Sequence, residues 1–460
     1  MPCTFFGIEL ARRALVAHTI AAQVCGHNLA NAATEGYSRQ RAVLVPSDPW
    51  AYPSLQSETG AGQLGTGVDI ALIKRVQDQY LTARLRGSAS AHSYLEAWSG
   101  GLSETEALIC EPSEQGLGAQ LSAFWNAWHE LSLNPDDSAA RMSVREAGRA
   151  LAELFHSLTN SVSTQTQAVD EQVGCCGEEI NRLAHEIARL THGIRASLAV
   201  GAQPNDLMDQ RDQALLELSR IAEVRVAEAT DGGLVLTLGG RTLVQDETVI
   251  PLRWSVHDGV ICLQWSDDSS AVGVSGGRLG ALLAIRDDLL PWVQGQLDET
   301  AARLVNAVNE VHREGYGLDG VSNRDFFVGS TAADIALSEP VLNSLSAIAA
   351  GMSPEPGDGG NAARIGELRN EQSLGPDSHY RDMVTAIGVR VGAATQEHKT
   401  QQLLADHLLV LREQIAGVST DEEVIALMRY QQGYNAAARL LTVMDEMLER
   451  LILHTGLVGR

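Results

Sequence analysis

The first thirty residues carry an apolar repeat with the spacing of an amphipathic helix. Two interleaved rows share a seven-residue step: Ile8, Leu15, Ala22 and Leu29 in one, and Ala11, His18, Cys25 and Ala32 in the other. Two such rows, offset by three or four positions, are typical of a coiled-coil seam. We expect this helix to end near Asn31, because Gly36 follows closely and can adopt the left-handed turn that often succeeds a helix.

The end of the chain has the same kind of pattern over a longer stretch. Its apolar positions step by three and four without a break: Leu427, Tyr430, Tyr434, Ala437, Leu441, Met444, Leu448 and Leu451. Ser419 or Thr420 can cap this helix, and residues 421–453 would extend for about 50 Å at 1.5 Å per residue. An apolar seam of this length needs a partner, and the N-terminal seam is the other one without a partner. We therefore predict that the two ends of the chain pair in a coiled-coil stem.

The intervening chain alternates between helical and strand-like patterns. Residues 76–222 are mostly helical, with a break at Asn134–Asp137, where aspartates can cap the next helix. From residue 223 short runs alternate at period two, and Asp231-Gly232-Gly233 is a hairpin signal. Helical pattern resumes after Gly276-Gly277, gives way to a loop-rich segment over 316–375, and returns from about 380, with a pause at 417–419.

These changes predict a mainly α fold with a β-rich insert. We divide the chain into a stem helix and following loop (1–75), a helical core domain (76–222), a β-rich outer insert (223–276), a return to the helical core (277–400) and a C-terminal stem helix (401–460). Pro291 can begin a helix within the fourth part, because a proline in a first turn costs little.

Composition and charge narrow the classes of function. The net charge is −24, from 34 basic and 58 acidic side chains, which argues against nucleic-acid binding. No run of about 18 uncharged apolar residues is present, so we expect no membrane insertion. Glu9 and Arg12 interrupt the apolar stretch from Phe5, so a cleaved signal peptide is not expected either. The six cysteines have no CxxC spacing, which disfavours a metal site.

One motif could indicate a cofactor. Gly60 to Gly65 matches GxGxxG, but a dinucleotide site needs a strand before the glycines and a helix after them. In this sequence Pro53 precedes and the strand-like Val68–Ile70 follows, so a flexible glycine turn is expected. No HExxH motif or oriented nucleophile is recognisable either. We expect no catalytic, cofactor-binding or metal-binding residues and therefore no enzyme; a thermal-shift test with dinucleotide would check the alternative.

Longer motifs carry a family resemblance. The segment from His27 through Asn28-Leu29-Ala30-Asn31 to Glu35-Gly36-Tyr37-Ser38-Arg39-Gln40 resembles the N-terminal motif of flagellar axial proteins. Its Glu-Gly-Tyr-Ser-Arg-Gln ending is similar to the hook-associated protein 1 family in particular. The run from Thr420 to Leu448 is similar to that family's C-terminal signature, although Gly433 stands where the family commonly has alanine.

Interior segments also resemble that family, in the same order along the chain. They are Gly65-Thr66-Gly67-Val68 with Ile73-Lys74-Arg75, Asn205 to Asp212, and Gly277 to Leu283 with Arg286-Asp287. The resemblance implies an extracellular structural subunit at the junction of flagellar hook and filament. It also implies export by the flagellar type III apparatus, a chaperone on the C-terminal helix, and contacts with the hook protein and the next hook-associated protein.

The assembly interface is then expected in the stem. We predict seam contacts within or between subunits involving Leu15, Ala22, Leu29, Leu427, Tyr434, Leu441 and Leu448. We predict a turn leading out of the stem formed by Asn28, Asn31, Gly36 and Tyr37. Two further alternatives remain open: another axial protein of the hook or distal rod, and a cytoplasmic coiled-coil protein. Limited proteolysis of the monomer would test the second alternative, because an axial subunit should lose both chain ends quickly, whereas a coiled-coil protein should keep them.

Overall fold

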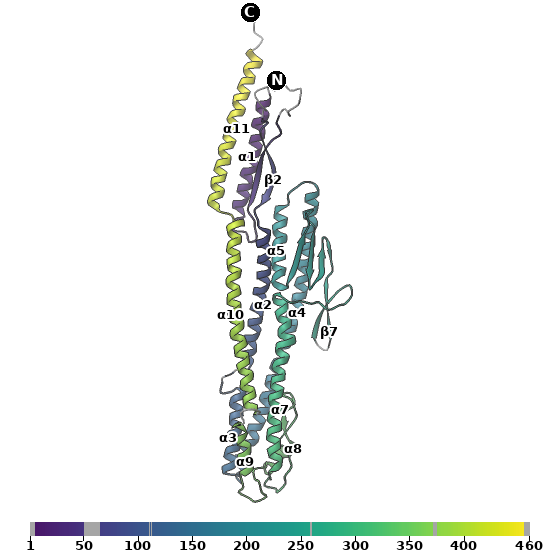
Figure 1. Ribbon diagram of the computed structural model, residues 1–460, viewed down its shortest axis with the longest axis vertical. Coiled ribbons are helices and arrows are strands. Elements are labelled where there is room, and N and C mark those ends of the chain that lie inside the picture. Colours follow the sequence, from purple (N-terminus) through teal and green to yellow (C-terminus); the bar gives the residue numbers. More distant parts are fainter. Residues whose placement is uncertain are drawn as a thin grey trace, which may run out of the picture.

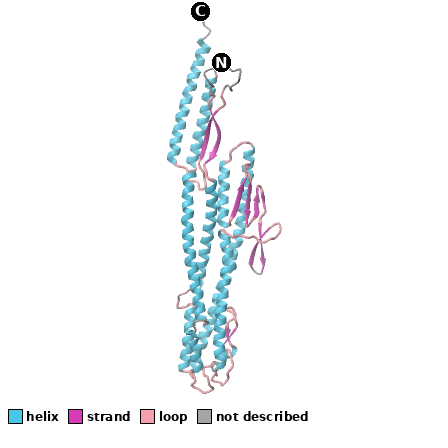
Figure 2. Ribbon diagram, viewed as in Figure 1, coloured by secondary structure: helices cyan, strands magenta, loops and turns pink. Residues whose placement is uncertain are grey.

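The chain forms a long, narrow rod in which the first and last helices lie at the same end (Figure 1). The computed structural model describes residues 5–49, 65–109, 111, 113–257, 260–370 and 375–454. Helices make up most of these residues and the strands form small sheets (Figure 2), which confirms the mainly α class with a β-rich insert. Within the described part of the chain, no helix combines the length and apolar character needed to cross a membrane.

The stem is the part of the rod formed by the two ends of the chain. Helix α1 (Phe6–Ala30) lies beside α11 (Thr420–His454), and the antiparallel strands β1 (Gln40–Pro46) and β2 (Val68–Arg75) pack on α1. The prediction that the terminal helices pair is therefore confirmed for a single chain. Helix α1 ends where the sequence indicated, with Asn31 as the residue after its last turn.

Below the stem, two pairs of long helices form the shaft of the rod. Helix α2 (Gln79–Ile109) runs beside α10 (Pro376–Ala416), and α4 (Ser138–Ala199) packs against α5 (Asn205–Ile221). The 62-residue helix α4 begins at the predicted aspartate cap: Asp137 accepts a hydrogen bond from the Ala139 backbone N–H at 2.9 Å.

The chain returns to the shaft through one interrupted helix. Helix α6 (Gly277–Ala284) continues through the π-helical turn η1 (Ile285–Leu289) into α7 (Leu290–Glu314). Pro291 lies in the first turn of α7, as predicted. Because proline has no N–H to donate, its position directly after a turn with altered hydrogen bonding leaves fewer unsatisfied groups than a position in mid-helix.

The far end of the rod holds an aromatic core under the loop-rich segment. Its short elements are α3 (Leu117–Leu133), β9 (Phe327–Val328), β10 (Ala336–Leu337), α8 (Glu339–Asn343), η2 (Leu345–Ala347), α9 (Gly360–Glu367) and η3 (Leu368–Asn370). Phe124, Trp128, His312 and Phe326 are buried together, with ring centroids 5.2–6.2 Å apart in the contacting pairs. Edge-on and tilted aromatic packing of this kind fixes the loops to the shaft.

The β-rich insert packs on the C-terminal half of α4. Its strands are β3 (Val224–Glu228), β4 (Leu234–Leu238), β5 (Arg241–Gln245), β6 (Thr248–Val249), β7 (Leu252–His257) and β8 (Val260–Trp265). The first four form an antiparallel sheet, and β7 and β8 form a separate hairpin. The predicted turn at Asp231-Gly232-Gly233 connects β3 to β4, with Gly232 at φ +83°.

A buried ion pair fastens the insert to the shaft. The Arg286 guanidinium donates to Asp170 Oδ1 at 2.8 Å and to the Ile261 carbonyl oxygen at 2.7 Å. Asp170 Oδ2 in turn accepts from the Ile261 N–H at 2.8 Å. One residue each from η1, α4 and β8 is thus joined in a single network.

The proposed start of the C-terminal stem helix at residue 401 needs correction. Residue 401 lies inside α10, which packs along α2 in the shaft. The break falls at residues 417–419, as the glycine and serine there suggested, and the stem helix itself begins at Thr420. An apolar repeat continues on both sides of that break, so periodicity alone did not locate it. Most of the GxGxxG match, residues 60–64, lies outside the described residues.

Candidate assembly interface

The interface between α1 and α11 is built on small residues. Ala11, Ala21 and Cys25 are buried on α1, and Ala437 is 7% exposed on α11. Glycines occupy two close approaches: a Cβ on Gly7 would lie 2.6 Å from Met444 Sδ, and one on Gly433 would lie 2.7 Å from the His18 ring. Small side chains let two helix backbones approach closely, so this seam is narrow and shape-specific.

The predicted seam residues are not all equally enclosed. Half-buried positions are Leu15, Ala22, Leu29, Leu427, Leu441 and Leu448. Tyr434 is 44% exposed and lies away from the most buried face of α11. The second row of the N-terminal repeat, with Ala11 and Cys25, is the more deeply buried one. Part of the apolar surface of the predicted seam therefore faces outward in the single chain.

His18 and Gly433 explain one departure from the family pattern. The His18 ring packs against Tyr430 with ring centroids 6.2 Å apart, and Gly433 lies on the other side of the seam from it. Alanine at position 433 would bring its methyl group into the imidazole. The large side chain of His18 on α1 thus packs where α11 has a glycine, Gly433, which has no side chain to obstruct it.

Asn28 is the centre of a buried polar cluster where the stem meets the shaft. The side chain is 1% exposed. Its amide nitrogen donates to the Gln40 carbonyl oxygen at 2.8 Å and to Glu423 Oε2 at 3.1 Å. Its oxygen accepts from the Tyr37 hydroxyl at 2.8 Å and from the Gln40 N–H at 2.9 Å. The amide thus uses two donor hydrogens and an acceptor oxygen at one position, a combination that only Asn and Gln side chains offer.

The beginning of α11 is held to the same cluster by charge. Arg39 donates to Glu423 Oε1 at 2.6 Å and to Glu422 Oε2 at 2.8 Å. The Arg39 backbone N–H donates to the carbonyl oxygen of Ala416, the last residue of α10, at 2.9 Å. Glu423 is only 2% exposed, so its carboxylate depends on Arg39 and Asn28 for compensation. Burial and the neighbouring Glu423 raise the pKa of the Cys25 thiol to about 12, which keeps this cysteine protonated.

Helix α5 supplies the third side of the cluster. Gln40 donates to Asp206 Oδ1 at 2.7 Å and accepts from the Asn205 amide at 3.1 Å. The Ser38 N–H donates to Asp209 Oδ2 at 3.0 Å. The segment from Asn205 to Asp212 resembles a family motif whose role the sequence does not indicate, and these contacts place it against the N-terminal motif.

Arg75 ties the end of β2 to the same helix. Its guanidinium contacts Asp209 at 2.8 Å and Asp212 at 2.9 Å. Burial alone would lower the pKa of Arg75, but the two carboxylates raise it above its ordinary value. The pair of carboxylates therefore keeps this buried cation charged.

The predicted exit turn has the expected backbone. Asn31 donates to the His27 carbonyl oxygen at 3.0 Å and so closes the end of α1. Gly36 has φ +81°, where a side chain would be strained, and its carbonyl oxygen accepts from Arg412 at 2.9 Å. Tyr37 reaches back to Asn28, and burial, followed by the charges of Asp206 and Asp209, raises the pKa of its hydroxyl. The four predicted turn residues lie together.

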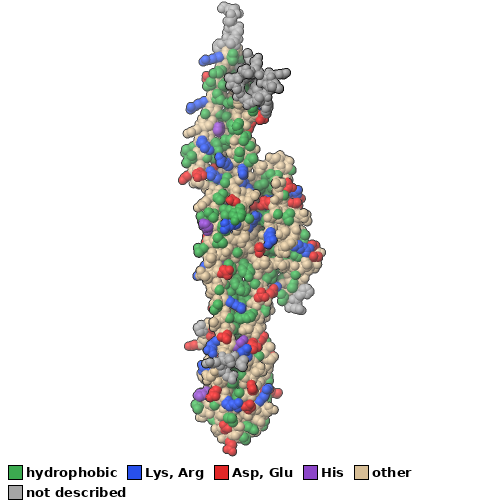
Figure 3. All heavy atoms as spheres, viewed as in Figure 1, with side chains coloured by type: hydrophobic (Ala, Val, Ile, Leu, Met, Phe, Trp, Pro, Cys, Tyr) green, Lys and Arg blue, Asp and Glu red, His purple; other side chains and the backbone are tan. Residues whose placement is uncertain are grey.

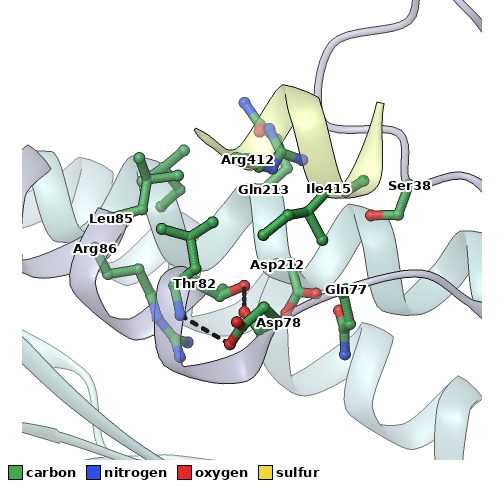
Figure 4. Close-up of a pocket in the computed structure, with 13 residues that line it drawn as sticks. Ser38, Gln77, Asp78, Thr82, Leu85, Arg86, Asp212, Gln213, Arg412 and Ile415 are labelled. Carbon is green, nitrogen blue, oxygen red and sulfur yellow. Dashed lines mark hydrogen bonds between the residues drawn. The ribbon is translucent and has the colours of Figure 1, made fainter. Parts of the chain in front are cut away.

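A small pocket lies directly beside this turn (Figure 4). It is lined by Ser38 from the turn, Asp78 and Arg86 near the start of α2, Asp212 from α5, and Arg412 from the end of α10. Both acidic and basic groups face it, so it favours no single charge. It marks the place where four segments of the chain converge, at the end of the shaft nearest the stem.

This arrangement holds segments of the chain together through polar contacts. Most polar groups in it are already paired, and within the described residues no group of three or more His, Cys, Asp or Glu side chains is placed to hold a metal ion. The surface of the stem, in contrast, has side chains that are free to contact another protein. Its outward side includes Val16, Ile425 and Met428, each 47–66% exposed.

Comparisons with known proteins agree with this geometry. Residues 102–327 match the family described as the flagellar hook-associated protein FlgK helical domain, and residues 414–452 match the C-terminal family of flagellar basal body rod proteins. Flagellar hook-associated protein 1 of Bacillus subtilis is 27% identical, over 100% of both chains. Its Salmonella typhimurium counterpart is 24% identical, over 97% of this chain and 98% of that protein.

A solved structure has the same fold. The flagellar hook junction protein FlgK from Burkholderia pseudomallei superposes with a TM-score of 0.65 over 73% of this chain and 100% of that one, at 15% identity. A rod of helices with paired chain ends, together with the rod-protein match at the C-terminus, defines an axial structural protein of the bacterial flagellum. Within that class, the chain belongs to the flagellar hook-associated protein 1 family.

Proposed function

We propose that the chain is a subunit of the hook–filament junction that polymerises through its paired terminal helices. The observation that carries the proposal is the polar cluster around Asn28. It fixes α1, α11 and α5 to one another through side chains of three separate motifs. A subunit that joins two polymers needs a stem of defined direction relative to its body, and this cluster defines that direction.

The outward surface of the stem supplies the contacts between subunits. Apolar side chains exposed on α1 and α11, including Val16 and Ile425, have room for a neighbouring helix. Burial of such side chains stabilises an assembly by roughly 25 cal/mol per Å². The half-buried Leu15, Leu441 and Leu448 contribute to the same interface from the edge of the seam.

The expected partners follow from this role. One end of the junction contacts the hook protein and the other contacts the next hook-associated protein. The subunit is exported by the flagellar type III route, with a chaperone on the C-terminal helix, and acts outside the cell. Support for the chaperone site comes from α11, whose exposed apolar side chains, among them Met428 and Met447, need cover before assembly.

The first test is deletion of the gene, followed by electron microscopy of the cells and detection of flagellin in the medium. The proposal expects complete hooks without filaments and flagellin lost to the medium. Absence of hooks would assign the chain to the rod or hook instead, and normal filaments would remove it from the axial structure.

The second test addresses the stem. Leu441→Asp places an unpaired carboxylate at the edge of the seam, with an expected cost on the order of 2 kcal/mol. We expect loss of filament attachment and motility. Thr442→Asp introduces the same charge one position away on the exposed side and should retain both. Normal motility of the Leu441→Asp strain would show that the seam is not needed for assembly.

A further inference from the structure

A groove on the stem carries positive charge that the chain itself does not neutralise. It runs between the β1–β2 pair and α11, and its walls include Arg41, Lys74, Arg429 and Tyr430. Arg41, Lys74 and Arg429 are exposed and, within the described part of the chain, form no ion pair. Arg429 lies over the Tyr430 ring, with its guanidinium carbon 5.4 Å from the ring centroid. Lys and Arg side chains are visible around this lower part of the stem (Figure 3).

Three unpaired cations in one groove are notable because the chain as a whole is strongly acidic, at −24. The fourth cation beside the groove, Arg75, is already neutralised by Asp209 and Asp212. A cationic groove kept free of the abundant carboxylates of its own chain is electrostatically complementary to an acidic segment of a partner.

The terminal helices also contain an acidic segment without partners. Near its end, α11 exposes Asp445, Glu446 and Glu449, and none of them forms an ion pair within the described residues. With Arg450 beside them, the segment 445–450 has a net charge of −2. Several other stem carboxylates are paired within the chain: Glu9 and Asp69 pair with Arg13, and Glu422 pairs with Arg39.

The groove of one chain cannot bind the acidic segment of that same chain. Both lie on α11, and the 17 or so positions between Arg429 and the centre of the acidic segment correspond to about 25 Å along a continuous helix. In a second copy with the same orientation, the segment reaches the groove when that copy is displaced by about that distance along the stem. Each copy then uses its groove towards one neighbour and its acidic segment towards another, a head-to-tail contact that propagates along an axis.

We infer that the groove formed by Arg41, Lys74 and Arg429 binds the acidic end of α11, residues Asp445, Glu446 and Glu449, of a second copy displaced along the stem. This contact rests on the proposed function and specifies which surfaces of neighbouring subunits meet. Because it is electrostatic, it orients the copies and selects their register before the apolar surfaces of the stem are buried.

The test is a disulfide cross-link in assembled flagella. The full chain carries Lys74→Cys and Glu446→Cys in a background where Cys3, Cys110, Cys175 and Cys262 are replaced by serine, so that the buried Cys25 and Cys176 are the native thiols that remain. It is expressed in the deletion strain, and isolated hook–filament fractions are oxidised and blotted under non-reducing conditions. The inference expects a ladder of dimers and larger oligomers, because each chain has one cysteine on each side of the contact. Lys74→Cys with Glu130→Cys, on α3 at the far end of the rod, is the matched control and should give no ladder.

The outcomes separate the contact from the function. No ladder from chains that are present at hook tips and support filaments would overturn the contact and leave the proposed function intact. Cross-linking of position 74 to a protein of another mass would overturn the choice of a second copy. Absence of the wild-type chain from hook tips would refute the proposed function, and the contact with it.

Charge exchange provides a second measurement. Arg41→Glu with Lys74→Glu should reduce the amount of chain at hook tips about tenfold, since like charges then face each other. Adding Asp445→Lys and Glu446→Lys to the same chain should restore it. If circular dichroism shows all variants folded and the combined variant remains as deficient as the first, the contact is wrong.

Discussion

Gly433 offers a sharp test of how the stem is packed, because two principles predict opposite results for the same substitution. In an exposed helix interior, Gly→Ala stabilises by up to about 1 kcal/mol. In this stem the new methyl carbon would lie 2.7 Å from Cε1 and Nε2 of His18. We therefore expect Gly433→Ala to destabilise the pairing of α1 with α11.

The size of the effect follows from the space available. Overpacking a well-filled interface costs about 1–3 kcal/mol. The imidazole is the end of a movable side chain, but Tyr430 packs against it and limits its movement. Subtracting the helix-propensity gain of about 1 kcal/mol leaves a net loss of about 0–2 kcal/mol. In a His18→Ala background the obstruction is gone, and the same substitution should stabilise by about 1 kcal/mol.

The assay is a double-mutant cycle measured in the stem itself. Hydrogen exchange of peptides from α1 and α11 reports local opening, which a melting curve of the whole chain would obscure. Gly26→Ala is the matched control: it lies in α1, and a Cβ there would meet nothing within 4 Å. It should slow exchange in both backgrounds equally.

The reasoning fails if Gly433→Ala slows exchange by the same amount with and without His18. Additivity would mean that the two residues do not share space, and that glycine at position 433 has no packing role. A coupling of about 1–3 kcal/mol is what the geometry requires.

Three further predictions concern other parts of the molecule. Burial lowers the pKa of His312 to about 4, so its stabilising contribution is complete above the unfolded pKa near 6.5. It should be lost progressively as the pH falls from there to 4, by about 3 kcal/mol in all; urea titrations across this range would detect it, and His312→Gln should flatten the dependence. Asp170→Ala leaves the Arg286 cation buried without its main partner and should cost about 3 kcal/mol, whereas Asp287→Ala, at an exposed partner of the same arginine, should cost less than 1 kcal/mol. Asn28→Asp replaces an amide donor with a carboxylate facing Glu423 and should abolish motility, while export of the chain, measured in the medium, persists.

The sequence predicted local features well where one physical rule determined them. The cap at Asp137, the turn at Gly36 and the hairpin at Asp231–Gly233 are each set by local backbone requirements. The pairing of the terminal helices was predictable because long apolar seams need partners.

Other features depend on contacts between distant segments, and no local pattern reports these. The predicted start of the C-terminal stem helix at residue 401 was wrong. Apolar residues recur at helical spacing in both α10 and α11, and only three residues separate the two helices. The choice of the buried row on α1 was not predictable from spacing either. Both rows have the same period, and the smaller side chains, Ala11 and Cys25, are the more buried because the helices approach closely there.

The polar cluster joins residues from three motifs that lie far apart in the sequence. The N-terminal motif contributes Asn28 and Arg39, the C-terminal motif contributes Glu423, and the mid-chain motif contributes Asp206 and Asp209 through Gln40 and Ser38. A change in the C-terminal or the mid-chain motif leaves a buried partner unsatisfied in the N-terminal motif, and a change in the N-terminal motif leaves one unsatisfied in each of the other two. The direction of the stem relative to the shaft is therefore determined jointly by three distant segments, and an assembly that depends on that direction depends on all three.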